Sequence, residues 1–423
     1  MLLRRAILLF VGALTALAQG RTQLDLDSFE KVWTTIRDKH WQVKPAGLDW
    51  QAIHDEYRPR VEKASTHDEA RAVMQEMLGR LKQSHFAIIP AVVYSVLDDE
   101  PEGPGSTGID ARVLDGRAIV TSVDPGSPAE KLGVRPGWQI ERAGGKDLKA
   151  VIDQARSNPA VHELQLTRAV LARLSGPIGG TLDATFLNSS GSKVNVSLSL
   201  TAPRGTFSSF GNLPAQAVFY ENKRIGQTAY VRFNMFLDLP RVMVSFQQTI
   251  ENCKTCDGLI IDLRGNPGGI GGMAMGMAGF LVDKPNQRLG TMYLRDSTLN
   301  FVVNPRADVF SGPVAVLVDG SSASTSEIFA GGLKDLGRAR LFGTHTAAAA
   351  LPSAFERLPN GDGFQYAVAN YISEGGQPLE GLGVTPDVAA ELTRAALLAG
   401  HDAVVDAAVD WIKTDWIRRQ KKP

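Results

Sequence analysis

Apolar residues follow a helical period over the first long stretch of the chain. Between residues 24 and 90 they recur every three or four positions, which is the spacing of one face of a helix. Thr66 followed by Glu69 is a capping-box pattern, so we expect a helix to begin there. At residues 81–90 the residues alternate instead and end at a proline, which predicts a turn into a strand. A small N-terminal helical region is therefore expected over residues 24–95.

A second region has the shorter period of β-strands. It follows a linker rich in acidic residues, glycine and proline at residues 98–105, which indicates a domain boundary. Short apolar runs bounded by glycine and proline predict several strands, including a hairpin over residues 181–200. A helix is expected near residues 151–156. The pattern therefore predicts a β-rich domain over residues 103–203.

A third region alternates between buried-type strands and helical segments. Helix periodicity is clear at residues 241–251. The tail at residues 388–413 is amphipathic and expected to be helical, and a C-terminal helix is assigned to residues 396–423. Strands are expected at residues 225–233, 258–263, 314–318 and 340–343. Because strands separated by helices are typical of a parallel sheet, we expect a βα layer over residues 219–395. The whole chain is predicted to be a multidomain protein of mixed α+β and α/β class.

Composition narrows the functional classes. The chain has 423 residues, enough for two to four domains. Its 45 basic and 45 acidic residues cancel, which gives no electrostatic reason to expect nucleic acid or an anionic membrane surface as a partner. No residue pattern implies a metal or another cofactor.

The N-terminus has the layout of a secretory signal. A basic start at residues 1–5 precedes an apolar run at residues 6–17, and Ala16-Leu17-Ala18 is a small-residue cleavage pattern. We therefore expect a signal peptide over residues 1–18 and an exported, periplasmic or extracellular mature chain without a membrane span. An uncleaved N-terminal anchor is the alternative.

The two cysteines of the chain, Cys253 and Cys256, stand just before a predicted strand. In an exported protein a local disulfide is plausible, whereas a zinc site would need two further ligands that are not nearby in the sequence. A redox motif would be expected to open a helix after a strand, and here a strand follows it. A structural role is therefore expected.

Two glycine- and serine-rich turns carry the candidate chemistry. Ser324 stands where a helix begins after a strand, so exposed backbone N–H groups there favour developing negative charge. It is a candidate nucleophile, although a serine in that place can equally be a helix cap. The glycines of residues 262–269 follow another strand and allow backbone N–H groups to approach a ligand closely. No Gly-Lys-Ser or Gly-Lys-Thr follows, which argues against a nucleotide loop.

These two turns resemble those of the tail-specific, or C-terminal processing, peptidases. Asp-Leu-Arg-Gly-Asn-Pro-Gly-Gly with Ser-Ala-Ser-Thr-Ser-Glu-Ile is similar to the paired motifs of that family. The resemblance implies a βα-layer core of the ClpP/crotonase kind, with Ser324 as the nucleophile. It also implies oxyanion donors at the N–H of Thr325 and in the Gly268-Gly269 turn. Asp335 matches an acidic position on the following helix, where its role is either structural or supporting.

One position departs from the commonest pattern of the family. Most members pair the serine with a lysine, and that place falls on Ala349, which cannot accept a proton. Lys334 stands ten residues after Ser324, about 15 Å further along the helix, so it cannot substitute. A serine and lysine pair is therefore not expected.

The chain is similar instead to the tricorn core protease branch of the superfamily. That branch has a Ser-His pair before the β-rich insert and a glutamate before a Gly-Val-x-Pro-Asp motif, features matched by Ser84, His85 and Glu380. The resemblance implies that His85 is the general base, oriented by the other two. Two alternatives stay open: Glu374 in place of Glu380, and His345 in place of His85. The Ser-His pair could also be a hydrogen-bonded surface pair.

The β-rich region resembles a PDZ domain of bacterial processing proteases. Gly-Ser-Pro-Ala followed by Gly-Val-Arg-Pro-Gly is an unusual ordered set. The resemblance implies that an extended peptide or a C-terminal end adds as a strand near Gly108, Ile109 and Asp110. A module kept only for packing is the alternative. The favoured function is an exported serine endopeptidase acting on polypeptides; an inactive binding protein and an esterase-like hydrolase are the alternatives. The sequence does not determine the oligomeric state.

Overall fold

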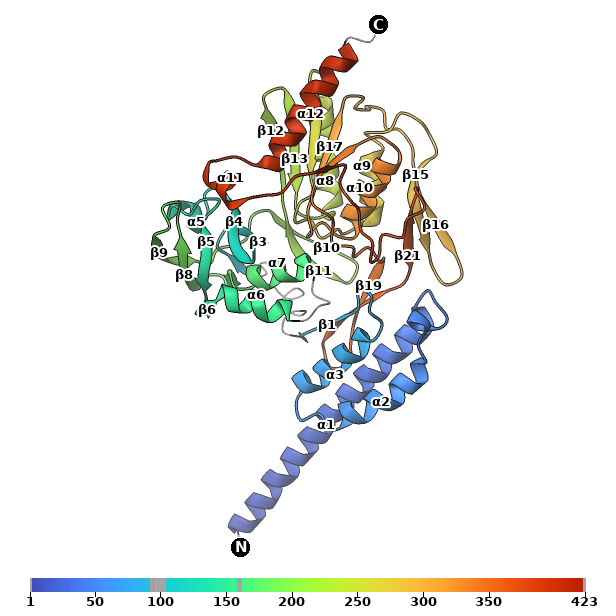
Figure 1. The fold of residues 1–423 in the computed structure, drawn as a ribbon. Helices are drawn as coiled ribbons and strands as arrows, with labels where there is room; N and C mark the ends of the chain where they lie inside the picture. Colours follow the sequence, from blue (N-terminus) through green and yellow to red (C-terminus); the bar gives the residue numbers. More distant parts are fainter. Residues whose placement is uncertain (1, 92–93, 95–103, 158–161, 421–423) are drawn as a thin grey trace.

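The computed structural model describes residues 2–91, 94, 104–157 and 162–420 (Figure 1). Side chains are described from residue 19 onward. The side chains of the predicted signal peptide, residues 1–18, are therefore not described. Residues 98–103 of the predicted linker lie outside the described residues. Within the described part of the chain, no helix is both long enough and apolar enough to cross a membrane.

Three helices form the N-terminal region, as the periodicity predicts. They are α1 (Leu2–Lys39), α2 (Trp50–Glu62) and α3 (His67–Gly79). Their apolar faces meet in a core that contains Phe29, Tyr57 and Met74. Thr66 caps α3 by accepting a hydrogen bond from the Glu69 N–H at 3.1 Å, so the predicted helix start is confirmed.

A short sheet joins this helical region to the C-terminal part of the chain. Strand β1 (Ala87–Ile89) pairs antiparallel with β20 (Gly363–Ala367), which pairs in turn with β19 (Ser353–Arg357). Phe364 of β20 is fully buried against the helices. The segment just before β1 is thereby brought beside residues almost three hundred positions later in the chain.

The middle region is a twisted antiparallel sheet with the strand order β3-β4-β5-β8-β9, so β3 is an edge strand. The predicted hairpin is confirmed and consists of β8 and β9. The strands are β3 (Ile109–Leu114), β4 (Arg117–Val123), β5 (Gln139–Ala143), β8 (Thr181–Leu187) and β9 (Lys193–Ser199), with β6 (Lys146–Asp147) paired to β5. Two-stranded pieces flank it: β2 (Gly105–Ser106) with β7 (Ser175–Gly176), and β10 (Thr206–Phe210) with β11 (Leu213–Val218).

Three helices belong to this middle region: α5 (Pro128–Lys131), α6 (Leu148–Arg156) and α7 (Glu163–Leu171). The helix expected near residues 151–156 is α6. Helix α7 packs on the edge strand β3, with Leu166 and Val170 in the shared core. Figure 1 shows α7 on the side of the sheet that faces the C-terminal region.

A six-stranded sheet forms the C-terminal region, in the order β12-β13-β14-β17-β18-β22. Its strands are β12 (Tyr220–Ile225), β13 (Thr228–Phe233), β14 (Gly258–Asp262), β17 (Val314–Val318), β18 (Arg340–Gly343) and β22 (Val388–Ala389). All pairs are parallel except β12 with β13. The strand predicted over residues 225–233 is confirmed as β13, except at its start, where Gly226, at φ +60°, turns the chain back into a hairpin with β12.

Helices cover both faces of this sheet (Figure 1). Helices α8 (Leu239–Glu251), α9 (Gly271–Ala278) and α10 (Thr325–Asp335) pack on one face, and α12 (Ala403–Gln420) packs on the other. The tail is not one helix over residues 388–413 as predicted. It begins with β22 and the short α11 (Arg394–Leu398) before α12. A separate sheet, β16 (Thr298–Val303), β15 (Gln287–Tyr293) and β21 (Asn370–Ser373), flanks the layer.

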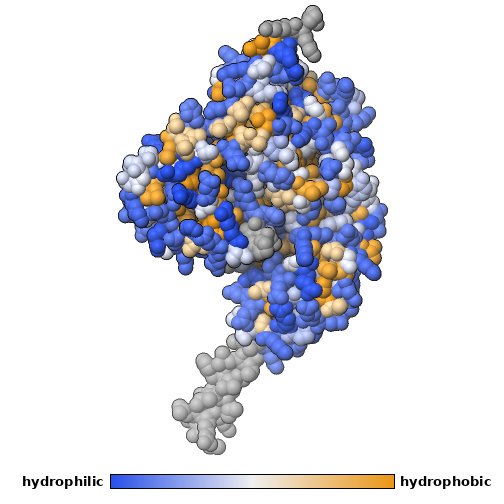
Figure 2. Space-filling view, in the orientation of Figure 1, coloured by the Kyte–Doolittle hydropathy of each residue, from blue (hydrophilic) through white to orange (hydrophobic). Residues whose placement is uncertain are grey.

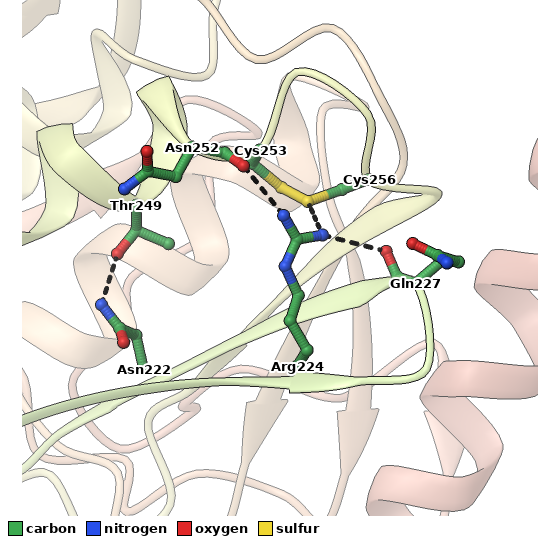
Figure 3. Close-up of a disulfide and its surroundings, with 7 residues drawn as sticks. All are labelled: Asn222, Arg224, Gln227, Thr249, Asn252, Cys253 and Cys256. Carbon is green, nitrogen blue, oxygen red and sulfur yellow. Dashed lines mark hydrogen bonds between the residues drawn. A yellow bond between two sulfur atoms is a disulfide. The ribbon is translucent and has the colours of Figure 1, made fainter.

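Cys253 and Cys256 form a disulfide at the end of α8 (Figure 3). Both cysteines are buried, and the Arg224 guanidinium reaches across to the Asn252 carbonyl at 2.8 Å and to the Cys256 sulfur. The expected local disulfide is confirmed. It lies before β14, at the opposite end of that strand from the glycine turn.

The visible surface is mostly polar, with apolar residues gathered in small groups (Figure 2). Among the exposed large apolar side chains are Phe210 and Leu299. Scattered apolar residues of this kind are ordinary on a protein surface and define no partner.

Candidate active site

Two neighbouring parallel strands end side by side and carry the two chemically informative turns. Strand β14 runs into the glycine turn, and β17 runs into the segment that contains Ser324. The Ala323 N–H and the Ser326 hydroxyl both donate to the Asn266 carbonyl, at 3.1 and 2.9 Å. The Thr325 hydroxyl donates to the Gly269 carbonyl at 2.7 Å. The structure thus brings the two predicted turns together at one edge of the sheet.

Ser324 has a backbone conformation that a serine rarely adopts. Its φ is +54° and its ψ is −119°, and such residues cost about 1–3 kcal/mol and gather at functional sites. It is the N-cap residue of α10 and forms a capping box with Glu327, whose carboxylate accepts from the Ser324 N–H at 3.1 Å. The helix-cap alternative is therefore confirmed as a structural role, and the partly exposed Ser324 stays a candidate nucleophile as well.

The glycine turn packs directly on the nucleophile candidate. A Cβ at Gly268 would lie 2.7 Å from the Ser324 Cβ, so only glycine fits there without movement. The Gly268 N–H donates to the Asn266 side-chain oxygen at 3.0 Å, which removes it as a ready oxyanion donor. Gly269, at φ +137°, follows it, and its N–H remains the candidate donor in this turn. Thr325 supplies a first-turn N–H of α10 from the other side.

Ser84, His85 and Glu380 are hydrogen-bonded to one another. The Ser84 hydroxyl lies 2.6 Å from His85 Nδ1 and donates to Glu380 Oε2 at 2.7 Å. The Ser84 N–H donates to Glu380 Oε1 at 2.6 Å, so the carboxylate grips the serine at two points. The sequence separates these residues by almost three hundred positions, and the β1–β20 pairing brings them together.

This arrangement fixes the proton on the histidine ring. The Ser84 hydroxyl has one hydrogen and gives it to Glu380, so it accepts a hydrogen bond from His85 Nδ1–H. The lone pair of the ring then stands on Nε2, as a general base requires. Burial, aided by the positive charge of Arg168, lowers the pKa of His85 to about 4. His85 is therefore neutral at physiological pH.

The segment 346–350, where a lysine would stand in most relatives, contains no lysine and serves as a backbone bridge. The Ala349 carbonyl accepts from the Ser324 N–H at 2.8 Å, and the Ala350 N–H donates to Glu380 Oε2 at 3.1 Å. The nucleophile candidate and the Ser84-His85-Glu380 relay are thus connected through this segment.

Glu327 holds this bridge in place, and the sequence analysis assigned it no role. Its buried carboxylate accepts from the Thr346 hydroxyl and from three backbone N–H groups, those of Ser324, Ala348 and Ala349, at 2.5 to 3.1 Å. Burial raises the pKa of Glu327 to about 7, against the opposing effect of these donors. Its spacing from Ser324 in the pattern Ser-x-x-Glu is the signal that could have drawn attention to it.

The alternative residues make other contacts in the structure. Glu374 is exposed and pairs with Arg288 at 3.0 Å, so Glu380 is the glutamate that meets Ser84. His345 is exposed, and its Nδ1 lies 2.9 Å from the Thr346 carbonyl. Asp335 is at the far end of α10 and accepts from the Gly375 N–H at 2.8 Å. Asp335 therefore has a structural contact away from Ser324.

The predicted peptide-binding residues have mixed outcomes in the structure. Gly108, at φ +79°, packs so closely on Ser127 that a Cβ would lie 2.2 Å from the Ser127 Cβ. Ile109 begins β3, which stands at the edge of the strand order but is largely buried, with helix α7 packed on it. The Asp110 carboxylate is already paired with two arginines, Arg112 and Arg232, at 2.6 and 2.8 Å. Asp110 is therefore a residue of an ion-pair network, and its carboxylate is not free for a peptide.

Comparisons with known proteins identify two related domains in the chain. Residues 227–390 match the model of peptidase family S41, and residues 26–79 match the tricorn protease C1 domain. The chain therefore carries an S41 peptidase domain and a tricorn-type N-terminal region. Its class is serine peptidase.

Two curated relatives are carboxyl-terminal processing proteases. The chain is 28% identical over 309 residues to CtpA of Bacillus subtilis (strain 168), a match that covers 72% of this chain but 60% of that protein. It is 25% identical over 429 residues to the carboxyl-terminal-processing protease of Synechocystis sp. (strain ATCC 27184 / PCC 6803 / Kazusa), which covers 96% and 92% of the two chains.

Solved structures share the fold. The photosystem II D1 C-terminal processing protease has a TM-score of 0.58 at 20% identity, covering 90% of this chain and 98% of its own. The tricorn protease has a TM-score of 0.54 at 18% identity, covering 93% of this chain and 37% of its own. The mixed α/β, multidomain architecture expected from the sequence is confirmed.

Proposed function

We propose that this chain is an exported serine endopeptidase that cleaves peptide bonds through an acyl-enzyme at Ser324, with His85 as the general base. The observation that supports this most is the Ser84 hydroxyl between His85 Nδ1 and Glu380 Oε2. That chain of bonds leaves the lone pair on Nε2 and places a carboxylate behind the ring. A surface pair with no catalytic role would not need a partly buried carboxylate fixed at two points.

The reaction follows from the proton inventory. His85 Nε2 takes the proton of the Ser324 hydroxyl as the oxygen attacks the carbonyl carbon of the substrate, and the resulting imidazolium is stabilised through Ser84 by Glu380. The Gly269 and Thr325 N–H groups stabilise the negative oxygen of the tetrahedral intermediate. His85 then gives its proton to the leaving amine. Water attacks the acyl-enzyme by the same path in reverse.

A ready general base of this kind contributes about 10²–10⁴-fold in rate. The low pKa of His85 keeps the base form available at physiological pH. The absence of a lysine from residues 346–350 is consistent with a histidine mechanism in this chain.

The substrate class is an extended polypeptide. We interpret the middle region as PDZ-like and the C-terminal layer as ClpP/crotonase-like, and a PDZ-like sheet is suited to adding a peptide strand or a C-terminal end at its edge strand, here β3. The basic and apolar start of the sequence supports export to a periplasmic or extracellular location.

A fluorophosphonate probe, which reacts covalently with activated serines, tests the proposal. It should label the wild-type protein, fail to label Ser324→Ala and label His85→Ala far more slowly, while His345→Ala behaves as wild type. Equal labelling of wild type and Ser324→Ala would overturn the nucleophile. Loss in His345→Ala with retention in His85→Ala would transfer the base. An unlabelled wild type that still binds peptide saturably would indicate a binding protein instead.

A further inference from the structure

The side chain of Arg112 extends from the middle sheet to the C-terminal layer. It stands on the edge strand β3, yet its side chain is 5% exposed, because it projects into the region between the two sheets. Its Nε donates to Asp319 Oδ2 at 2.9 Å, and its Nη1 donates to Asp110 Oδ1 at 2.6 Å and to the Ala111 carbonyl at 2.9 Å. A guanidinium suits this place because its rigid fork can serve several acceptors at once.

Asp319 is the partner that connects Arg112 to the site. It follows β17 directly, and its Oδ1 accepts from the Gly265 N–H and the Ser321 N–H, both at 2.9 Å. The first N–H belongs to the glycine turn and the second to the segment that leads to Ser324. One carboxylate oxygen therefore ties together the two turns that would supply the oxyanion donors, while the other oxygen is held by Arg112.

Neighbouring contacts strengthen this link. The Ser322 hydroxyl lies 3.3 Å from Asp319 Oδ1 and donates to the Leu263 carbonyl at 2.8 Å, which is a second bond between the same two turns. Gly265 lies against the arginine itself, since a Cβ there would be 2.1 Å from Arg112 Nη2. The guanidinium thus packs on the backbone of the glycine turn as well as on Asp319.

We propose that Arg112 is a positioning residue for the acylation of Ser324. Its guanidinium holds Asp319 in the orientation that keeps the turns after β14 and β17 in register, and so aligns the Gly269 and Thr325 N–H groups with the nucleophile. The inference rests on the proposed function. By this inference, a residue of the middle sheet helps to determine the rate of Ser324 acylation in the C-terminal layer.

Arg232 provides a matched control. It pairs with the same Asp110, at 2.8 Å, and is also largely buried, but the structure gives it no bond to Asp319 among the described residues. Arg112→Met and Arg232→Met therefore each remove one arginine from the same carboxylate. Only the first also frees Asp319.

The experiment measures inactivation by a small fluorophosphonate, separating the maximal rate from the concentration for half-saturation, with a thermal unfolding midpoint for each variant. We expect Arg112→Met to lower the maximal rate roughly 10²-fold, as a small misplacement of reacting groups does, with half-saturation unchanged. Arg232→Met should keep the wild-type rate even if its unfolding midpoint falls as far. Because Arg112 acts through Asp319, adding Asp319→Asn to Arg112→Met should cost little more than the worse single change.

Arg112→Lys covers the case in which Arg112→Met does not fold, because it keeps the charge and loses the fork. It should fold and still acylate more slowly than Arg232→Met. Wild-type acylation rates in folded Arg112 variants, or effects of Arg112→Met and Asp319→Asn that simply add, would overturn the inference and leave the proposed function intact. A wild type that the probe does not label would overturn the proposed function, and this inference with it.

Discussion

Ser324 and Glu380 are hydrogen-bonded to opposite ends of one peptide group. The carbonyl of that group, from Ala349, accepts the Ser324 N–H at 2.8 Å, and its N–H, from Ala350, donates to Glu380 at 3.1 Å. A peptide group is planar and rigid, so a displacement at one end is transmitted to the other. The nucleophile and the carboxylate of the relay are therefore held in a fixed relation by the backbone.

Replacement of Glu380 tests that relation. Glu380→Gln puts an NH₂ group where an oxygen now accepts from Ser84, which disturbs the proton order that leaves the lone pair on His85 Nε2. We expect kcat on a peptide substrate to fall on the order of 10²-fold with KM little changed. Glu374→Gln is the control, because that exposed side chain pairs with Arg288 instead. An equal loss in both variants would contradict the assignment.

In the proposed mechanism, the pH–activity profile should lose activity only at acidic pH, near the pKa of His85. Catalysis needs neutral His85, whose pKa is about 4, so kcat/KM should be nearly constant at neutral pH and fall only as the pH drops toward about 4. The positive charge of Arg168 opposes protonation of the ring, so Arg168→Gln should raise the pKa and move the acid limb to higher pH. Arg173→Gln, on the exposed turn after α7, should leave it in place. A limb that Arg168→Gln does not move would refute this electrostatic coupling.

Loss of the Glu327 carboxylate should weaken the hydrogen bonds that hold residues 346–350 in place. Glu327→Gln keeps one oxygen but turns an NH₂ group toward backbone N–H donors, so about two of four bonds are lost. At roughly 1.5–3 kcal/mol for each bond to a charged group, the free energy of unfolding should fall by about 3–6 kcal/mol, together with the labelling rate. Urea unfolding and probe labelling measure the two effects. Asp335→Asn, at the far end of the same helix, should change the labelling rate little, and a large effect there would restore a supporting role for Asp335.

Reduction of the disulfide should affect stability and spare activity. The bond closes a very short loop, so its loss should lower the free energy of unfolding by about 2 kcal/mol. The five residues of β14 separate it from the glycine turn by about 16 Å at 3.3 Å per residue. Cys253→Ala with Cys256→Ala should therefore be labelled at the wild-type rate. Slower labelling with unchanged unfolding would point to a redox role instead.

The sequence is sufficient to locate the two turns of the site, because each follows a run of apolar residues typical of a buried strand. The Ser84-His85 motif is recognisable because its two residues are adjacent in the sequence, and Ser324 is recognisable from the serine-rich segment around it. The contacts of Glu327 and the pairing of Asp110 with arginines could not be predicted, since both depend on partners distant in the sequence. Helix α7 was also missed, because its nine residues are too few to establish a helical period in the sequence.

The pairing of β1 with β20 has a consequence for how the chain is made. His85 arrives early in synthesis, whereas Glu380 is among the last residues to emerge, and the strand that docks the histidine segment needs residues 363–367. A partly synthesised or truncated chain therefore contains the base without its carboxylate and without its docking strand. Under the proposed function, peptide hydrolysis therefore begins only after residues 363–380 have folded against the N-terminal helical region.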